Sequence, residues 1–94
     1  MNLFNLDKKV ALITGGNGGI GYAMAKAMGD AGANIIIAGR NKDKNTLSVN
    51  KLKNSNIEAM AIEVDVDNEI SCQNMVYQVV DKFKKIDILV NNAG

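Results

Sequence analysis

The sequence predicts an α/β protein that forms the first half of a doubly wound parallel sheet, with element order βαβαβαβ and strand order 3-2-1-4. Three observations lead to this prediction. Four short apolar runs recur along the chain, the segments between them have the periodicity of helices, and the first run passes through a glycine-rich turn directly into a helix. Connections of this length suit parallel pairing, and right-handed crossovers give that strand order.

The first strand and helix follow from an unbroken apolar run and a repeating apolar stripe. Val10–Ile13 does not alternate with polar residues, which is typical of a strand buried on both faces. A helix is expected from Ile20 to Ala31, with Gly32 as its C-terminal stop. Its apolar side chains recur every three or four residues and predict one buried face. That face would contain Ile20, Ala23, Met24, Ala27, Met28 and Ala31.

A second strand and helix follow in the same way. Ile35–Ala38 is another unbroken apolar run and predicts a buried strand that ends at Gly39. Asn41 predicts the N-cap of a helix over Lys42–Lys53, whose lysines would form a solvated face.

The last elements are a strand near the sheet edge, a helix and a final strand. Met60–Val66 alternates large apolar residues with small or acidic ones, which suits an edge position. Asp67 predicts the N-cap of the third helix. Ile86–Val90 predicts the fourth strand, which would expose an apolar edge. The buried face of the third helix would contain Cys72, Val76, Val79, Val80 and Phe83.

The glycine-rich turn from Thr14 to Gly21 organises the rest of the chain. A strand that turns through glycines into a helix directs the helix's first N–H groups and its partial positive charge at one place, which suits a phosphate. The glycines satisfy three spacings at once: G-x-G-x-x-G from Gly16, and both G-x-x-G-x-x-G and G-x-x-x-G-x-G from Gly15. The turn alone therefore does not select a protein family.

Composition excludes several classes of function. The 94 residues carry 11 Lys and Arg against 10 Asp and Glu, with two Tyr and two Phe, so we expect no nucleic-acid partner. With no histidine and with Cys72 as the one cysteine, we expect no intrachain disulfide and no metal site, and Cys72 is predicted to be a reduced packing residue. The chain start lacks a targeting segment, and no apolar run approaches the roughly 20 residues that span a bilayer, which predicts a cytoplasmic protein without a membrane partner.

Three motifs, taken together and in order, resemble the amino-terminal part of the short-chain dehydrogenase/reductase family. The turn from Thr14 to Gly21 matches that family's cofactor loop in the third spacing, Asp65-Val66 matches the pair that contacts adenine, and Asn91–Gly94 matches the motif at the nicotinamide side. The resemblance implies an NAD(P)-binding Rossmann domain over residues 1–94 that stops before the family's catalytic segment. The last motif disfavours the alternatives of a sugar epimerase and a methyltransferase.

The resemblance implies a set of cofactor-binding residues. The start of the first helix would hold the pyrophosphate, Asn17 and Gly18 would line the ribose, and Asp65 would accept a hydrogen bond from the adenine amino group. The alternatives are that Asp65 is only a turn aspartate and Asn92 only a structural amide. The full set is Gly15, Asn17, Gly18, Gly19, Ile20, Gly21, Arg40, Asp65, Val66, Asn92, Ala93 and Gly94.

Arg40, at the end of the second strand, favours NADP over NAD. A guanidinium can hold a 2′-phosphate that an acidic residue would repel. Against this, Gly18 occupies the position where NADP-preferring relatives often place a base, and Arg40 as a solvated strand-end charge is the alternative.

The activity implied by the resemblance is hydride transfer between a nicotinamide and a ketone or secondary alcohol. The family's catalytic serine, tyrosine and lysine would lie beyond Gly94, so we expect no catalytic residue in this chain. A small-molecule carbonyl or alcohol substrate and a homo-oligomer are implied for the full-length enzyme. The alternative is a catalytically inactive nucleotide-binding fragment.

Tyr22 and Lys26 have the Tyr-x-x-x-Lys spacing of the family's catalytic pair. They fall on the first helix, directly after the phosphate turn and away from the expected nicotinamide end. We therefore expect them to be ordinary surface residues.

Overall fold

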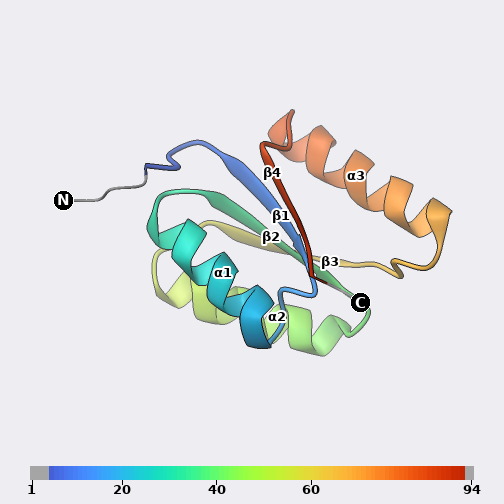
Figure 1. Cartoon of the computed structure of the whole chain (residues 1–94), viewed down its shortest axis with the longest axis horizontal. Coiled ribbons are helices and arrows are strands. Elements are labelled where there is room, and N and C mark those ends of the chain that lie inside the picture. Colours follow the sequence, from blue (N-terminus) through green and yellow to red (C-terminus); the bar gives the residue numbers. More distant parts are fainter. Residues whose placement is uncertain (1–4, 93–94) are drawn as a thin grey trace.

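A four-stranded parallel sheet in the order β3-β2-β1-β4 forms the centre of the molecule in a computed structural model that describes residues 5–92 (Figure 1). Helices α1 and α2 cover one face of the sheet and α3 covers the other. The predicted element order and strand order are confirmed. The strands are β1 (Val10–Thr14), β2 (Asn34–Gly39), β3 (Ala59–Glu63) and β4 (Ile88–Asn91), and the helices are α1 (Gly19–Asp30), α2 (Lys42–Asn54) and α3 (Glu69–Phe83).

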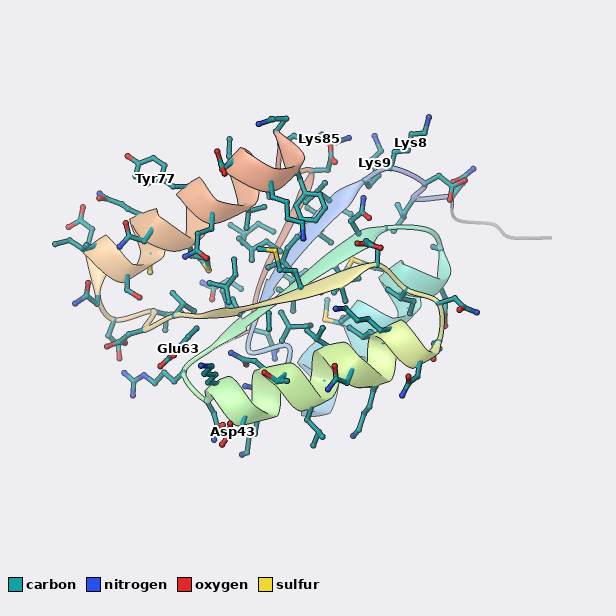
Figure 2. The ribbon with its side chains drawn as sticks, turned by 180° about the vertical axis from the view of Figure 1, so that it is seen from behind. Lys8, Lys9, Asp43, Glu63, Tyr77 and Lys85 are labelled. Carbon is teal, nitrogen blue, oxygen red and sulfur yellow. The ribbon has the colours of Figure 1, made fainter. Side chains whose placement is uncertain are left out.

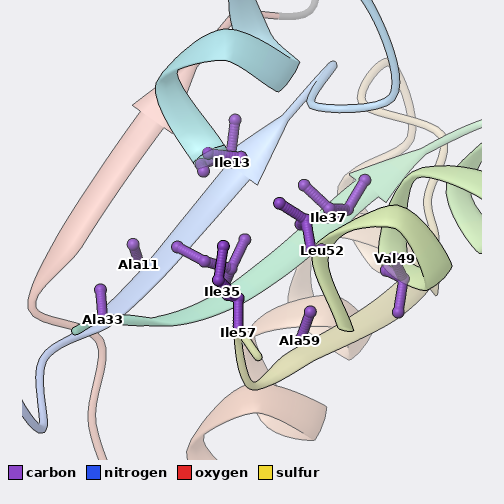
Figure 3. Packing of buried hydrophobic residues seen from close by; sticks show 10 residues of the cluster. Ala11, Ile13, Ala33, Ile35, Ile37, Val49, Leu52, Ile57 and Ala59 are labelled. Atoms are coloured by element: carbon purple, nitrogen blue, oxygen red, sulfur yellow. The ribbon is translucent and has the colours of Figure 1, made fainter. Parts of the chain in front are cut away.

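The two central strands are buried on both faces, as their unbroken apolar runs predict. All five residues of β1 are buried, and β1 pairs with β2 from Val10 opposite Asn34 to Thr14 opposite Ala38. Alternate strand residues point into two hydrophobic clusters, the first against α1 and α2 and the second against α3. The buried residues of the second cluster are Val10, Leu12, Ile36, Ala38, Ile62, Val64, Met75 and Val79. Figure 3 shows the first cluster, with Ala11, Ile13, Ala33, Ile35, Ile37, Val49, Leu52, Ile57 and Ala59 labelled.

Helix α1 contacts the sheet mainly through small residues, so the predicted buried face was wrong for Ile20, Ala23, Met24 and Ala27, whereas Met28 packs half-buried against the first cluster. Gly21, Ala25 and Gly29 are its buried residues, whereas Ile20 is 74% exposed. A Cβ atom on Gly29 would lie 2.6 Å from the Ile57 Cγ2 atom, so glycine allows the helix to approach the first cluster closely. Residues four apart form a ridge along a helix. In α1 the ridge formed by the smallest residues packs against the sheet.

The starts of α2 and α3 are capped by asparagine side chains. The Asn41 Oδ1 accepts a hydrogen bond from the Lys44 backbone N–H at 3.0 Å, which confirms the predicted cap of α2. The predicted cap of α3 was wrong by one residue, because the Asn68 Oδ1, and not Asp67, accepts from the Ser71 N–H at 2.9 Å.

Strand β3 is shorter than predicted. It ends at Glu63 and not at Val66, because its partner β2 ends at Gly39, which lies opposite Glu63. Val64 is nevertheless buried in the second cluster.

Helix α3 buries a narrower face than predicted. Met75 and Val79 are its buried residues, and Cys72 and Phe83 pack half-buried against the second cluster. Val76 and Val80 are 39% and 41% exposed, so the prediction was wrong for these two. The physical reason is that, within residues 5–92, α3 is the one helix on its face of the sheet, so it contacts the strands along one stripe.

Strand β4 begins at Ile88, two residues later than predicted, and pairs with β1. Within residues 5–92 it is an edge strand, and its Leu89 is 63% exposed, which confirms the predicted apolar edge.

Asp87 fixes the start of β4, because its Oδ2 accepts from the Val10 N–H at 2.8 Å and lies 3.0 Å from the Lys85 Nζ. Figure 2 shows Lys85 at the same end of the sheet as Lys8 and Lys9.

We expect Asp87 to make part of the stability depend on pH. The hydrogen bond from the Val10 N–H, followed by the contact with Lys85, lowers the pKa of Asp87. A carboxyl whose pKa is lowered by folding stabilises the protein above its unfolded-state pKa of about 3.9, and this contribution is lost as the pH falls through the folded-state pKa. The urea midpoint should therefore fall more steeply between about pH 5 and pH 3 in the wild type than in Asp87→Asn.

Asp81→Asn, at an exposed position on α3, is the matched control and should keep the wild-type dependence on pH. Equal slopes for the wild type and Asp87→Asn would contradict the role given to Asp87.

Candidate functional site

The carboxyl ends of the strands meet the start of α1 at the glycine turn. Gly15 and Gly19 have φ angles of +70° and +56°, in the left-handed region that glycine favours, as the turn requires. The Tyr22 N–H donates to the Gly18 oxygen at 3.3 Å, so the preceding helix amides are directed out of the helix end. No acidic residue occupies the first turn of α1. The start of α1 therefore offers backbone donors and partial positive charge to an anion.

The turn, α1 and the end of β4 approach one another most closely at Gly21. A Cβ atom there would overlap the Gly15 carbonyl oxygen and would lie 2.7 Å from the Asn92 Nδ2. The Asn92 Nδ2 donates to that same carbonyl oxygen at 3.3 Å, and its backbone N–H donates to the Thr14 oxygen at 3.2 Å. Asn92 thus makes the contacts of a structural amide that ties β4 to the turn.

The contact of Asn92 with a cofactor stays a prediction. The two other residues predicted at this end, Ala93 and Gly94, lie outside the described residues.

Asn17, in the turn, is hydrogen-bonded to a buried residue of α2. The Asn17 Nδ2 donates to the Asn45 Oδ1 at 2.8 Å. Asn45 is 1% exposed, and its Nδ2 donates to the carbonyl oxygens of Gly39 at 2.9 Å and Ile62 at 3.2 Å. The sequence analysis did not single out Asn45. Its position four residues before the buried Val49 was the available signal, because that spacing places it on the inward face of α2.

Arg40 follows β2 and binds two aspartates. Its Nη2 lies 2.9 Å from the Asp65 Oδ1 and 2.9 Å from the Asp67 Oδ2. The hydrogen bond from Arg40, followed by one from the Asp67 N–H, lowers the pKa of Asp65. The Asp65 Oδ1 accepts that N–H at 3.0 Å, which is the contact expected of a turn aspartate. The Arg40 side chain is 66% exposed, and ion pairs in such an environment are weak, so a competing anion can replace one of them.

These segments enclose a groove of about 340 Å³. Its polar backbone comes from Gly15, after β1, and Gly39, at the end of β2. Its apolar walls are the side chains of Val64 and Val66, and its charged groups belong to Arg40 and Asp67. Figure 2 shows Glu63, at the end of β3, and Asp43, near the start of α2, at this end of the molecule. A groove with apolar walls and one cation, open beside a helix N-terminus, can bind a flat ring together with a phosphate. Its lining residues are Gly15, Asn17, Gly39, Arg40, Val64, Val66 and Asp67.

Tyr22 and Lys26 lie on α1 and serve its packing. Tyr22 is half-buried against the first cluster, with the Lys51 Nζ 5.8 Å from its ring centre, so the expectation of an ordinary surface residue was wrong for Tyr22. The Lys26 Nζ is paired with the Asp30 Oδ2 at 2.7 Å, four residues further along the helix.

Cys72 is a free cysteine and packs half-buried against the second cluster, in the role predicted for it. Among residues 5–92, no group of three or more His, Cys, Asp or Glu side chains is placed to hold a metal ion. None of the helices in that same stretch combines the length and the apolar character needed to span a membrane.

A parallel sheet whose first strand turns through glycines into a helix, with a groove at the strands' carboxyl ends, defines the class of Rossmann-like α/β domains. Residues 9–94 match the model of the short chain dehydrogenase family. The chain belongs to this family.

Relatives and solved structures agree with this assignment. The chain is 38% identical over its whole length to an uncharacterized oxidoreductase, YgcW, of Escherichia coli and 37% identical to a 2-dehydro-3-deoxy-D-gluconate 5-dehydrogenase of Formosa agariphila, and it covers 36% of each. A crystal structure of an actinorhodin polyketide ketoreductase with NADPH superimposes with a TM-score of 0.90 at 30% identity, over 98% of this chain and 35% of that one. The chain thus spans about a third of the length of the proteins that it matches.

We expect a side chain at Gly21 to disrupt the junction of turn, helix and β4. Gly21→Ala should lower the free energy of unfolding by about 2 kcal/mol, as other overpacked buried positions do. Gly18→Ala is the matched control, because Gly18 has an extended backbone and a Cβ there would meet no atom within 4 Å. The control should change stability by less than about 0.5 kcal/mol in urea unfolding. If the two variants were equally stable, the close packing of the turn, α1 and β4 at Gly21 would be contradicted.

Proposed function

We propose that this chain is the cofactor-binding half of an NAD(P)-dependent oxidoreductase that transfers hydride between a nicotinamide and a ketone or secondary alcohol. The observation that carries the proposal is the start of α1, which opens beside the groove and has no acidic residue in its first turn. An anionic pyrophosphate fits this position. The bound dinucleotide would supply the hydride, and the residues of this chain would bind and orient it.

The pyrophosphate would be held by the backbone amides of Gly19–Gly21 at the start of α1. Glycine at position 21 fits this role, because any side chain there would collide with the turn. The adenosine would follow the groove, with Asn17 and Gly18 at the ribose and with Asp65 and Val66 at the adenine. The nicotinamide end would extend toward Asn92 at the end of β4, and we propose Ala93 and Gly94 as further contacts from the sequence motif.

NADP is the cofactor that we propose as preferred. Among the described residues that line the groove, Arg40 is the one cation, and a guanidinium can hold a 2′-phosphate. The ketoreductase structure described above, of similar fold, contains NADPH. Because Arg40 is paired with Asp65 and Asp67, a bound 2′-phosphate would have to replace at least one of these contacts.

The family's catalytic serine, tyrosine and lysine are proposed to lie outside this chain, as the resemblance implies. The contacts of Tyr22 and Lys26 support this view, since Tyr22 packs against the first cluster beside Lys51 of α2 and Lys26 is paired with Asp30 on α1. The second candidate function is therefore nucleotide binding without catalysis. For the full-length enzyme we propose a homo-oligomer in the cytoplasm.

We expect the chain to bind NADPH and not to catalyse turnover by itself. Binding is measured by the change in nicotinamide fluorescence on titration, and turnover by the absorbance at 340 nm with a panel of ketones. Gly19→Val should abolish binding, because Gly19 has a positive φ angle that a β-branched residue disfavours. If the wild-type protein does not bind NADPH, the proposed function is contradicted. If it catalyses turnover, the catalytic groups lie within these 94 residues.

We expect Arg40→Asp to shift cofactor preference from NADP toward NAD. Loss of a charge-assisted hydrogen bond to the 2′-phosphate should change the ratio of the two dissociation constants by at least about tenfold. Lys82→Asp, the same charge change on α3, serves as the control and should leave the ratio unchanged. If Arg40→Asp weakens the binding of NADP and NAD by the same factor, Arg40 does not bind the 2′-phosphate.

A further inference from the structure

Asn45 is a buried amide whose orientation is fixed by two backbone carbonyls. Its nitrogen donates to the Gly39 oxygen at 2.9 Å and to the Ile62 oxygen at 3.2 Å. A carbonyl oxygen only accepts hydrogen bonds, so the NH₂ group of Asn45 must point toward these two atoms. The amide oxygen of Asn45 is thereby directed the opposite way, toward the glycine turn.

The fixed oxygen of Asn45 in turn fixes the amide of Asn17. This oxygen can only accept, so Asn17 must present its NH₂ group to it, at 2.8 Å. The Asn17 oxygen points away from this contact and is the acceptor that Asn17 offers to a ligand in the groove that it lines, while its NH₂ group keeps one further N–H donor. Burial strengthens the arrangement, because an amide that is 1% exposed has no water to replace a lost partner.

Gly39 provides the space for this contact. A Cβ atom at position 39 would lie 2.9 Å from the Asn17 Nδ2 and 2.9 Å from the Asn45 Oδ1. The end of β2 therefore accommodates the pair of amides only because it carries no side chain. The turn, the end of β2 and α2 are thus joined at one point beside the groove.

We infer that Asn45 is a positioning residue for the cofactor site: it orients the Asn17 amide so that the turn presents an oxygen acceptor to a hydroxyl group of the ligand. The inference rests on the proposed function, in which Asn17 lies at the adenosine ribose. A ribose hydroxyl can donate to this oxygen, whereas a phosphate oxygen, which only accepts, cannot form a hydrogen bond with it. Asn17 would therefore bind the 3′-hydroxyl that NAD and NADP share, and the phosphate would be left to Arg40.

The first measurement needs no ligand. In the NMR spectrum of the ¹⁵N-labelled protein, the Asn17 side-chain NH₂ protons should exchange with solvent more slowly than those of Asn50, an exposed asparagine on α2. This protection should be lost in Asn45→Ala. If Asn45→Ala fails to fold, Gly39→Ala replaces it, since the added Cβ would lie 2.9 Å from both the Asn17 Nδ2 and the Asn45 Oδ1 and would separate the two amides without removing either residue. Exchange of Asn17 as fast as that of Asn50 in the wild type would overturn the inference.

The second measurement is a double-mutant cycle on NADPH affinity, with Asn17→Ala, Asn45→Ala and the double variant. Asn45→Ala should weaken NADPH binding about fivefold, the size of one hydrogen bond, and should have no further effect when Asn17 is already alanine. A general weakening of the fold would instead add the same loss in both backgrounds, and that result would overturn the positioning role.

The two measurements separate the inference from the function on which it rests. If the wild-type protein shows a protected Asn17 amide but binds neither NADPH nor NADH, the proposed function and the ribose contact are contradicted. If the protein binds NADPH and its Asn17 amide is unprotected, the proposed function stands and the positioning role of Asn45 is contradicted.

Discussion

The arrangement of the site depends on the missing side chain at Gly21. At this position α1 contacts the carbonyl group of Gly15, and Asn92 at the end of β4 reaches the same carbonyl. The turn and the start of α1 can meet the end of β4, which lies 77 residues beyond Gly15, only because no Cβ separates them. This convergence brings the amides of the helix start to the carboxyl ends of the strands, so the general position of the ligand groove is a consequence of backbone packing.

The groove combines two kinds of polar contact with different physical behaviour. Arg40 and its two aspartates are exposed and charged, so their pairing is weak and can change when an anion binds. Asn17 and Asn45 are neutral, and the buried Asn45 is held by two carbonyl oxygens, so their geometry is fixed before any ligand arrives. One side of the groove is thus adaptable and the other is preorganised.

The sequence by itself determined the strands, their order and the position of the turn. Each of these features depends on residues close together in the chain, such as the unbroken apolar runs Val10–Ile13 and Ile35–Ala38 and the glycines at Gly15 and Gly19 that permit positive φ angles. The Asn41 cap was predictable for the same reason, since its partner is only three residues away.

Only the tertiary structure decided which faces and side chains meet. Both the small and the larger residues of α1 recur with helical spacing, and contact between Gly29 and Ile57 selected the small ones. Asp67 pairs with Arg40, 27 residues earlier, and leaves the helix cap to its neighbour. Asn45 bonds to three other segments of the chain. Such choices depend on distances between segments, and a local pattern of residues does not contain those distances.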